Sequence, residues 1–284
     1  MSQLFAVIGN PIEHSRSPLI HQQFARQMGI DLVYEKLWAP IDGFEAAVRE
    51  FMERGGAGMN VTVPFKLEAF DLADEHSPRA KRALAANTLV FPQEAGGPIR
   101  ADNTDGIGLV NDLAFHGVEI TGRRLLILGA GGATRGVLEP LLERTPSALT
   151  IANRNPERAY GLVEEFADVA GDCLLSGCPL AAIEATPFDL IINATPASLA
   201  RQLPPLPDEI IGPETTAYDM AYSAEPTVFM EWAASRGASP HDGLGMLVEQ
   251  AAESFLLWQG RRPDTAPVRL ALREAIARTE QRQD

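Results

Sequence analysis

The stretch Leu125-Leu126-Ile127-Leu128-Gly129-Ala130-Gly131-Gly132-Ala133-Thr134 joins a short aliphatic run directly to a glycine-rich turn. Aliphatic runs of this length are typical of a buried strand in a parallel sheet, and the glycines allow a tight turn into a helix. The first backbone N–H groups of such a helix point at a bound phosphate. The stretch therefore predicts a dinucleotide-binding βαβ unit whose residues 129–133 contact a pyrophosphate. By itself, the glycine pattern is also compatible with a glycine-rich surface turn.

The residues after the turn supply the rest of this unit and indicate which dinucleotide it binds. Apolar residues recur at helical spacing over 137–142, and a second apolar run covers 148–152. NAD-binding units place Asp or Glu at the end of the second strand, where it bonds the ribose 2′-OH. This chain has Asn153 and Arg154 there, with Arg158 four residues on. Because arginine can hold a 2′-phosphate through two parallel N–H bonds, the sequence favours NADP; the alternative is that both arginines are solvated surface charges.

Bulk properties exclude several classes of protein. The 284 residues suffice for one large or two ordinary domains, and a net charge of −14 argues against nucleic-acid binding. No apolar run reaches 18 residues, so we expect neither a membrane span nor secretion. Cys173 and Cys178 lack metal or disulfide spacing, and the five histidines show no metal pattern, so we expect a cytoplasmic protein without a metal site. An anionic ligand would need local positive charge, for which Arg135 and Lys66 join the two arginines named above.

The order of apolar and polar segments predicts two α/β domains. Strands are expected at 4–8, 32–37 and 59–63, helices from Pro18 and after a cap at Asp42, a short helix at Ser77-Pro78, and a hairpin-like pair at 88–91 and 98–101. Further strands fit 189–194 and 216–220, and the chain after Gly243 is helical. We therefore expect an N-terminal α/β substrate-binding domain (1–102 and 245–284), with C-terminal helices returning to it, and a Rossmann-type domain (103–244). A cleft between them would hold the ligands.

Four polar clusters stand at predicted strand ends, where side chains of a parallel sheet converge. They are residues 15–17, 60–66, 86–88 and 102–105, and they suit a small polyhydroxylated acid. Lys66 is one of only three lysines, and a lysine, unlike arginine, can exchange a proton. Asp102 is its predicted partner. Simpler readings remain open: Ser17 could cap the helix at Pro18, Asn87 and Thr88 could be turn residues, and Lys66 could be solvated.

Taken in order, these motifs resemble the AroE-type shikimate/quinate dehydrogenase family over nearly the whole chain. Besides the segments above, the resemblance includes Gly9-Asn10-Pro11, Asn193-Ala194-Thr195, Asp219-Met220 and Asp242-Gly243-Leu244-Gly245. It implies an oxidoreductase that reversibly reduces 3-dehydroshikimate to shikimate with NADPH, in chorismate and aromatic amino-acid biosynthesis. Alternatives are an NAD-dependent quinate/shikimate dehydrogenase and a non-catalytic NADP-binding regulator. The resemblance leaves a homodimer open and implies no membrane partner.

The resemblance also implies roles for individual residues. Lys66 and Asp102 form the expected catalytic pair. The expected substrate contacts are Ser15, Ser17, Thr62, Asn87, Tyr222 and Gln250. The expected NADP contacts are Gly129, Ala130, Gly131, Gly132, Ala133, Asn153, Arg154, Arg158, Thr195, Met220 and Gly243. One departure is Ala197-Ser198-Leu199-Ala200, which replaces a glycine-containing loop on the nicotinamide side.

Overall fold

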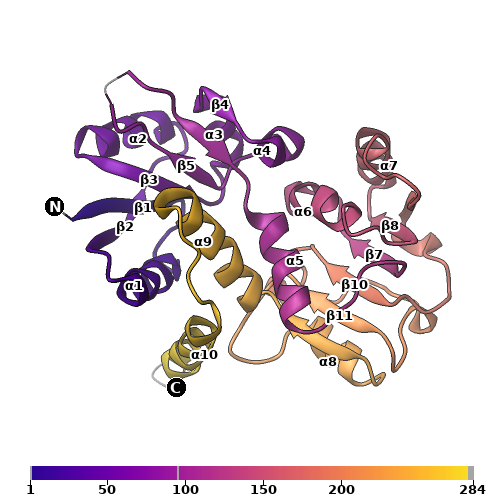
Figure 1. Ribbon diagram of the computed structural model, residues 1–284. Helices are drawn as coiled ribbons and strands as arrows, with labels where there is room; N and C mark the ends of the chain where they lie inside the picture. Colours follow the sequence, from indigo (N-terminus) through magenta and orange to yellow (C-terminus); the bar gives the residue numbers. More distant parts are fainter. Residues whose placement is uncertain (1, 95, 281–284) are drawn as a thin grey trace. The chain divides into compact units, whose positions relative to one another are not determined.

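The computed structural model describes residues 2–94 and 96–280 and divides the chain into two compact units (Figure 1). Unit 1 comprises the described residues up to Gly108 together with Val248–Leu272. Unit 2 comprises Leu109–Leu247 and the described residues from Arg273 onward. Each unit has its own sheet and its own core, and each is described separately below.

Unit 1 is built on a six-stranded mixed sheet. The strands lie in the order β2 (Leu32–Trp38), β1 (Gln3–Gly9), β3 (Gly56–Val61), β5 (Thr88–Val90), β6 (Arg100–Asp102) and β4 (Glu75–His76). β1 pairs in parallel with both β2 and β3, whereas β5 is antiparallel to β3 and to β6. The predicted pair at 88–91 and 98–101 is thus confirmed as an antiparallel pair. The two-residue strand β4 was not predicted.

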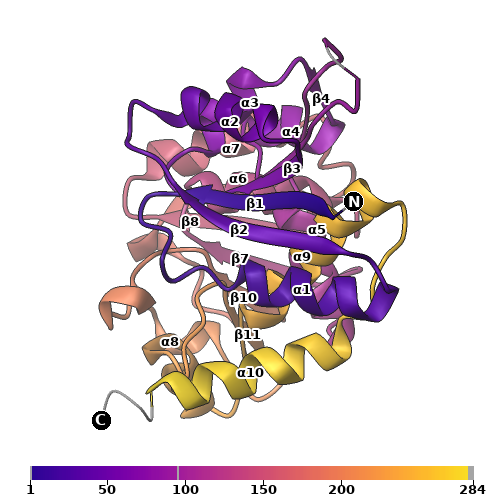
Figure 2. The ribbon, with the colours of Figure 1, turned by 90° about the vertical axis from the view of Figure 1, so that its left-hand side faces the viewer.

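Helices cover both faces of this sheet (Figure 2). Alternate residues of β1 serve the two faces: Ala6 and Ile8 join the core beneath α2 (Phe44–Glu53) and α3 (Lys66–Leu72), while Phe5 and Val7 pack with Tyr34 and Trp258. This second layer contains α1 (Ser17–Met28) and the part of α9 (Leu244–Gln259) that belongs to unit 1. The two-residue period of a strand therefore accounts for a core on each side.

The helix starts in unit 1 only partly follow the predicted caps. Ser77 accepts a hydrogen bond from the Ala80 N–H at 3.1 Å and caps α4 (Pro78–Ala83), as its position before proline predicts. The predicted cap at Asp42 is wrong, because α2 begins after Gly43 without a side-chain cap. Ser17 lies inside the first turn of α1, after Arg16, and makes no capping bond. Its hydroxyl is therefore available for another contact.

Unit 2 is a doubly wound parallel sheet. The strand order is β12 (Ser239–Asp242), β11 (Thr216–Asp219), β10 (Leu190–Asn193), β7 (Arg124–Leu128), β8 (Ala148–Asn153) and β9 (Leu174–Pro179). Every pair is parallel. The chain order reverses between β7 and β10, which is the topological switch point of a Rossmann-type sheet. The predicted fold class is confirmed, and the edge strands β9 and β12 were not predicted.

The core of unit 2 also lies on both faces of its sheet. Leu125 and Ile127 of β7 pack with α5 (Asp105–Phe115), α6 (Gly132–Leu142) and α7 (Pro156–Phe166). Leu126 and Leu128 pack on the other face with α8 (Val228–Ala234) and the short helices η1 (Leu180–Ala182) and η3 (Asp208–Ile210). Helix α10 (Ala266–Glu280) begins in unit 1 and ends in unit 2. Within residues 2–94 and 96–280, no helix combines the length and apolar content needed to cross a bilayer.

Candidate functional site

The glycine turn of unit 2 lies at the switch point of the sheet. Gly129 has φ +107°, a conformation that favours glycine, and its N–H donates to the Ala152 carbonyl at 2.8 Å. A Cβ at Gly129 would lie 3.1 Å from Thr195 Cγ2 and 3.3 Å from the Ala194 backbone. Helix α6 begins three residues later, so its first N–H groups stand at the end of β7. Backbone donors, close approach and absence of side chains fit a pyrophosphate.

Two unpaired arginines follow the neighbouring strand. Arg154 and Arg158 are exposed, just beyond the end of β8, and within the described residues neither guanidinium makes an ion pair. Asn153 folds back locally, donating from Nδ2 to the Asn155 carbonyl at 2.8 Å. Arg135, also expected to supply free positive charge, instead forms an ion pair with Glu165. The two exposed guanidinium groups fit a 2′-phosphate better than a bare ribose hydroxyl.

The remaining predicted NADP contacts follow the next three strands of the same edge. The Met220 N–H donates to the Asn193 carbonyl at 3.0 Å, and the Gly243 N–H donates to the Ala221 carbonyl at 3.1 Å. The backbone N–H and Oγ1 of Thr195 both donate to Asn193 Oδ1, at 3.1 and 2.7 Å. Because these strands are parallel and adjacent, Thr195, Met220 and Gly243 stand on the same edge as the glycine turn.

The loop that departs from the family pattern is fixed by a buried carboxylate. Ser198 opens the short helix η2 (Ser198–Ala200), and its hydroxyl donates to Asp219 Oδ2 at 2.5 Å. Thr227 Oγ1 donates to the same oxygen at 2.7 Å, and Asn193 Nδ2 donates to Asp219 Oδ1 at 3.2 Å. Asp219 is fully buried, so these donors compensate its charge. Ser198 thus ties this loop to the end of β11.

In unit 1, Lys66 is held by a carboxylate at the start of α5. Lys66 Nζ lies 2.5 Å from Asp105 Oδ2. Asp105 Oδ1 accepts from Asn87 Nδ2 at 2.8 Å, and the same amide donates to Gln250 Oε1 at 3.2 Å. Thr104 completes the group by donating its N–H to Asn87 Oδ1 at 2.9 Å. The predicted residues Lys66, Asn87 and Gln250 are therefore brought together, from α3, the residue just before β5, and α9.

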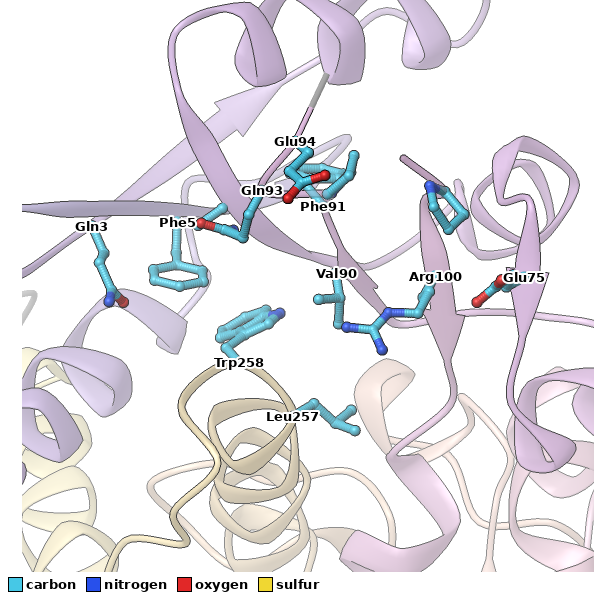
Figure 3. A pocket seen from close by; sticks show the side chains of 13 residues that line it. Gln3, Phe5, Glu75, Val90, Phe91, Gln93, Glu94, Arg100, Leu257 and Trp258 are labelled. Carbon is cyan, nitrogen blue, oxygen red and sulfur yellow. The ribbon is translucent and has the colours of Figure 1, made fainter. Parts of the chain in front are cut away.

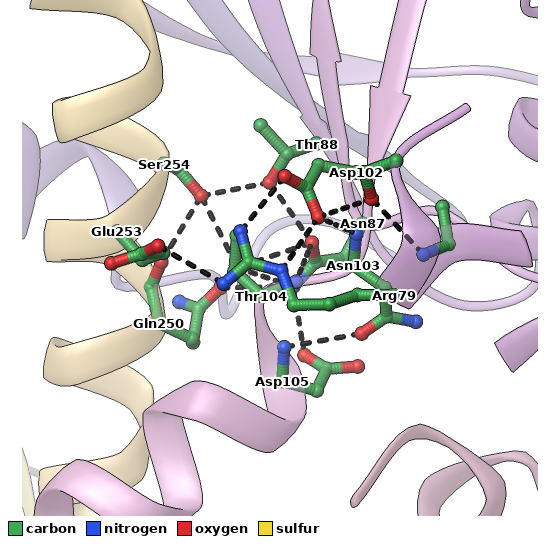
Figure 4. A network of polar contacts seen from close by, with 12 residues as sticks. Arg79, Asn87, Thr88, Asp102, Asn103, Thr104, Asp105, Gln250, Glu253 and Ser254 are labelled. Atoms are coloured by element: carbon green, nitrogen blue, oxygen red, sulfur yellow. Dashed lines mark hydrogen bonds and ion pairs between the residues drawn. The ribbon is translucent and has the colours of Figure 1, made fainter. Parts of the chain in front are cut away.

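Asp102 occupies a different environment, which corrects the predicted pairing of Asp102 with Lys66. Its carboxylate accepts from Arg79 Nε at 3.0 Å and Nη2 at 2.8 Å, and from Ser77 Oγ at 2.7 Å. It is only 6% exposed, and its oxygens are occupied by these donors and by the Asn103 N–H. Figure 4 shows the Arg79 guanidinium alongside Asp102. The ammonium–carboxylate pair of this unit is Lys66 with Asp105.

The predicted serines belong to a second group of polar residues in unit 1. Ser15 and Ser17 lie 3.3 Å apart through their hydroxyls. The Tyr34 hydroxyl donates to Asn60 Oδ1 at 2.6 Å, and burial raises its pKa well above the ordinary value, with the Ser17 side chain opposing this effect. Tyr34 therefore stays protonated as a donor. Asn60 in turn donates to the Ser254 hydroxyl at 3.0 Å.

Two further predicted substrate residues follow the ends of strands. Thr62 follows β3, and its N–H donates to the Ile8 carbonyl at 3.0 Å, which sets it beside the end of β1. Tyr222 lies three residues beyond β11 and belongs to unit 2.

Several residues of these groups carried no usable sequence signal. Tyr34, Ser254, Arg79 and Glu253 lie outside the predicted clusters, and only the fold brings them together. Asp105 lies inside a predicted cluster, but the sequence predicts Asp102 as the partner of Lys66.

Unit 1 also contains a groove (Figure 3). Its volume is about 560 Å³, and Phe5, Trp258, Arg100 and Glu94 are among its lining residues. None of the predicted site residues lines it, so it is not the site that the sequence predicts.

Comparison with known proteins identifies the family to which this chain belongs. A chain with a Rossmann-type sheet, a glycine turn, exposed arginines after the neighbouring strand and a lysine–carboxylate pair has the parts of a nicotinamide-dependent oxidoreductase. Family models match along its length: a shikimate dehydrogenase substrate binding domain over residues 7–89, a shikimate/quinate 5-dehydrogenase domain over 112–201, and a shikimate 5′-dehydrogenase C-terminal domain over 243–273. The chain belongs to the shikimate dehydrogenase family.

Named relatives are similar over almost the full length. Shikimate dehydrogenase (NADP(+)) of Alkalilimnicola ehrlichii is 54% identical over 275 residues, covering 96% of this chain and 99% of the relative. The Chromohalobacter salexigens protein of the same name is 53% identical and covers 96% and 98%. The crystal structure of shikimate 5-dehydrogenase from Thermus thermophilus in complex with NADP(H) and shikimate has a TM-score of 0.85 at 34% identity, covering 96% and 99%.

Proposed function

We propose that this chain is an NADP-dependent shikimate dehydrogenase, which reversibly reduces 3-dehydroshikimate to shikimate in chorismate biosynthesis. The observation that carries the proposal is the Lys66–Asp105 pair, held by Asn87 beside Gln250. A pure binding protein needs no such pair. Relatives more than 50% identical over 96% of the chain carry the name of this activity.

The proton in this reaction is handled by residues of unit 1. A bound nicotinamide supplies the hydride that reaches the carbonyl carbon of the substrate. As negative charge builds on the carbonyl oxygen, Lys66 stabilises it and donates a proton. Asp105 holds the ammonium in place at 2.5 Å and offsets its charge between turnovers. Because Lys66 Nζ and Asp105 Oδ2 are in direct contact, the two residues act together on this proton.

Substrate and cofactor are assigned to the two groups of residues described above. Asn87 and Gln250 present amide groups beside the pair and bind ring hydroxyls. Ser15, Ser17 and Thr62 supply hydroxyl donors for the carboxylate, and Tyr222 is a further contact. In unit 2, residues 129–133 hold the pyrophosphate, while Arg154 and Arg158 hold the 2′-phosphate. We assign substrate binding to residues 1–102 with 245–284, and NADP binding to 103–244.

The proposal is tested by absorbance at the nicotinamide band with shikimate and NADP, repeated with NAD and with quinate. We expect turnover with shikimate and NADP at a kcat/KM at least about tenfold above that of the other combinations, the factor expected from about 1.4 kcal/mol of differential binding. Lys66→Ala should lower kcat at least about a hundredfold with little change in KM. A rise in KM alone would make Lys66 a binding residue. Preferred turnover of quinate with NAD would favour the quinate/shikimate alternative, and NADP binding without turnover the regulator.

The location and assembly of the protein complete the proposal. We place it in the cytoplasm, because Cys173 and Cys178 are free and burial raises the pKa of both thiols, which keeps them unreactive. The assembly stays open between a monomer and a homodimer. Sedimentation equilibrium of the purified chain distinguishes a dimer from a monomer of 30.7 kDa.

A further inference from the structure

An alternating series of ionised side chains runs through unit 1. It consists of Asp102, Arg79, Glu253, Arg262, Glu249 and Arg269. Each successive pair has nitrogen and oxygen atoms between 2.6 and 3.0 Å apart. The series links the end of β6, helix α4, two turns of α9 and helix α10. Three carboxylates and three guanidinium groups balance in charge, so the series acts as one neutral unit rather than as isolated pairs.

Arg79 is the member of this series nearest to the proposed site. Its guanidinium binds both oxygens of Asp102 through Nε and Nη2, and its Nη1 reaches Glu253 Oε1 at 3.0 Å. Because the guanidinium group is planar and binds through several N–H groups, it fixes the orientation of the carboxylates as well as their distance. Figure 4 shows Arg79 lying between Asp102 and Glu253 of α9.

On one side of Arg79 is the turn that carries Asp105. The Asp102 carboxylate accepts the Asn103 N–H at 2.7 Å, and Asn103 Oδ1 accepts the Asp105 N–H at 3.1 Å. The Asp102 carbonyl accepts the Asn87 N–H at 3.1 Å. The orientation of the Asp102 carboxylate therefore affects the position of Asp105 through these two hydrogen bonds.

On the other side of Arg79 is the helix that carries Gln250. Glu253 follows Gln250 by three residues on α9, and Ser254, one residue further, lies 2.8 Å from Thr88 Oγ1 through its hydroxyl. The helix is close to α5 here, because a Cβ on Gly108 would lie 2.7 Å from Gln250 Cβ. A small shift of α9 therefore moves the Gln250 amide relative to Asn87.

We propose that Arg79 is a positioning residue for the substrate of this enzyme. By bridging Asp102 and Glu253, it fixes Asp105 and Gln250 against Asn87, and so sets where the substrate lies relative to the Lys66–Asp105 pair. The inference rests on the proposed function, because it assigns those residues to catalysis and binding.

The fold has bonds that do not depend on Arg79. Asn103 Nδ2 donates to the Ala85 carbonyl at 3.1 Å, and the Thr104 N–H donates to Asn87 Oδ1. Ser77 still donates to Asp102 Oδ1 in the absence of the guanidinium. We therefore expect the turn to keep its path while the Asp102 carboxylate, left without its counter-charge, changes direction.

The experiment compares Arg79→Gln, Arg79→Lys and the unmodified chain by steady-state kinetics, with rates expressed per folded molecule. We expect Arg79→Gln to lower kcat/KM for shikimate by roughly ten- to a hundredfold, the range for a substrate displaced by about an ångström. KM for NADP should stay within about twofold, because Arg79 belongs to unit 1 and the NADP residues to unit 2; about twofold is under 0.5 kcal/mol. Arg79→Lys keeps the charge without the fork and should recover only part of the loss. Millimolar guanidinium should partly restore Arg79→Gln, and equal urea should not.

The control is Arg49→Gln, which removes an ion pair with Glu45 on the exposed face of α2. It should leave every kinetic constant unchanged. Full kcat and KM per folded molecule in Arg79→Gln, with only a lower Tm, would overturn the inference, as would equal losses for shikimate and NADP. If Arg79→Gln does not fold, full activity in Arg79→Lys overturns it, and a selective loss for shikimate supports it. No turnover in the unmodified chain would refute the proposed function, and this inference with it.

Discussion

A buried histidine makes the stability of unit 1 depend on pH. His21 on α1 is fully buried, with its ring stacked on Tyr34 at 4.4 Å between centroids and 5.2 Å from the ring of Trp258. Burial lowers the pKa of His21 from 6.5 to about 3, and the Asn60 side chain offsets only part of this effect. The ring is therefore neutral in the folded protein at any pH at which the enzyme would work.

The size of the effect follows from the two pKa values. Between pH 6.5 and about 3, the unfolded chain binds a proton at His21 that the folded chain does not bind. Stability is thus unaffected by this group above pH 6.5 and falls as the pH decreases below it, by about 1.4 kcal/mol per pH unit. At about pH 5 the loss from His21 alone should reach about 2 kcal/mol.

The measurement is urea unfolding at several pH values between about 5 and 7.5, followed through tryptophan fluorescence, to which Trp258 beside His21 contributes. His21→Phe removes the titrating group and keeps an aromatic ring in the stack. Below pH 6.5, we expect the free energy of unfolding of this variant to fall less steeply than that of the parent. The difference in slope should be about 1.4 kcal/mol per pH unit, the effect of one proton. His14→Gln, at an exposed position, is the matched control and should keep the parent slope. Equal slopes in His21→Phe and the parent would refute the reasoning.

Four further substitutions test the assignments in the two units. Asp105→Asn should lower kcat by about 10²- to 10⁴-fold, measured by steady-state kinetics. Asp102→Asn should lower kcat only about tenfold and destabilise the fold by about 1–3 kcal/mol, measured by thermal unfolding. A larger effect on kcat at Asp102 than at Asp105 would reverse the assignment. Arg154→Ala should raise KM for NADPH far more than KM for NADH, and equal effects would remove the case for a 2′-phosphate contact. Ser198→Ala should raise KM for NADPH a few-fold and lower Tm, because Asp219 loses a charged hydrogen bond worth about 1–3 kcal/mol. If KM and Tm are both unchanged, this loop has no role in cofactor binding.

Local patterns predicted the central elements of both sheets. The run ending at Leu128 and the glycines after it were sufficient for β7 and α6, because a buried strand and a phosphate-binding turn each leave a local signature. The missed strands β9 and β12 are the two edges of the same sheet. Edge strands are partly solvated and need no continuous apolar run, and β12 reads Ser-Pro-His-Asp. Pairing with neighbours, rather than their own residues, makes these segments strands.

The wrong prediction of Asp102, rather than Asp105, as the partner of Lys66 has a similar cause. Both carboxylates stand in one short turn, and a sequence does not reveal which of them faces Lys66. The deciding partner is Arg79, which lies 23 positions before Asp102 and carries no motif of its own. Asp105 begins helix α5, where a carboxylate is favoured by the helix N-terminus. That signal was available, but capping chemistry alone does not distinguish a structural from a reactive carboxylate.

In a chain with net charge −14, unpaired arginines beside the proposed anionic contacts supply local positive charge there. Arg79, Arg135 and Arg262 are committed to carboxylates and contribute little net field. Within the described residues, Arg154 and Arg158 make no ion pair, and neither does Arg16, which stands between Ser15 and Ser17. Unpaired arginines thus occur beside the proposed 2′-phosphate and carboxylate contacts. Lys66, by contrast, is neutralised by Asp105, which suits a group that handles a proton at a carbonyl oxygen rather than one that holds an anion.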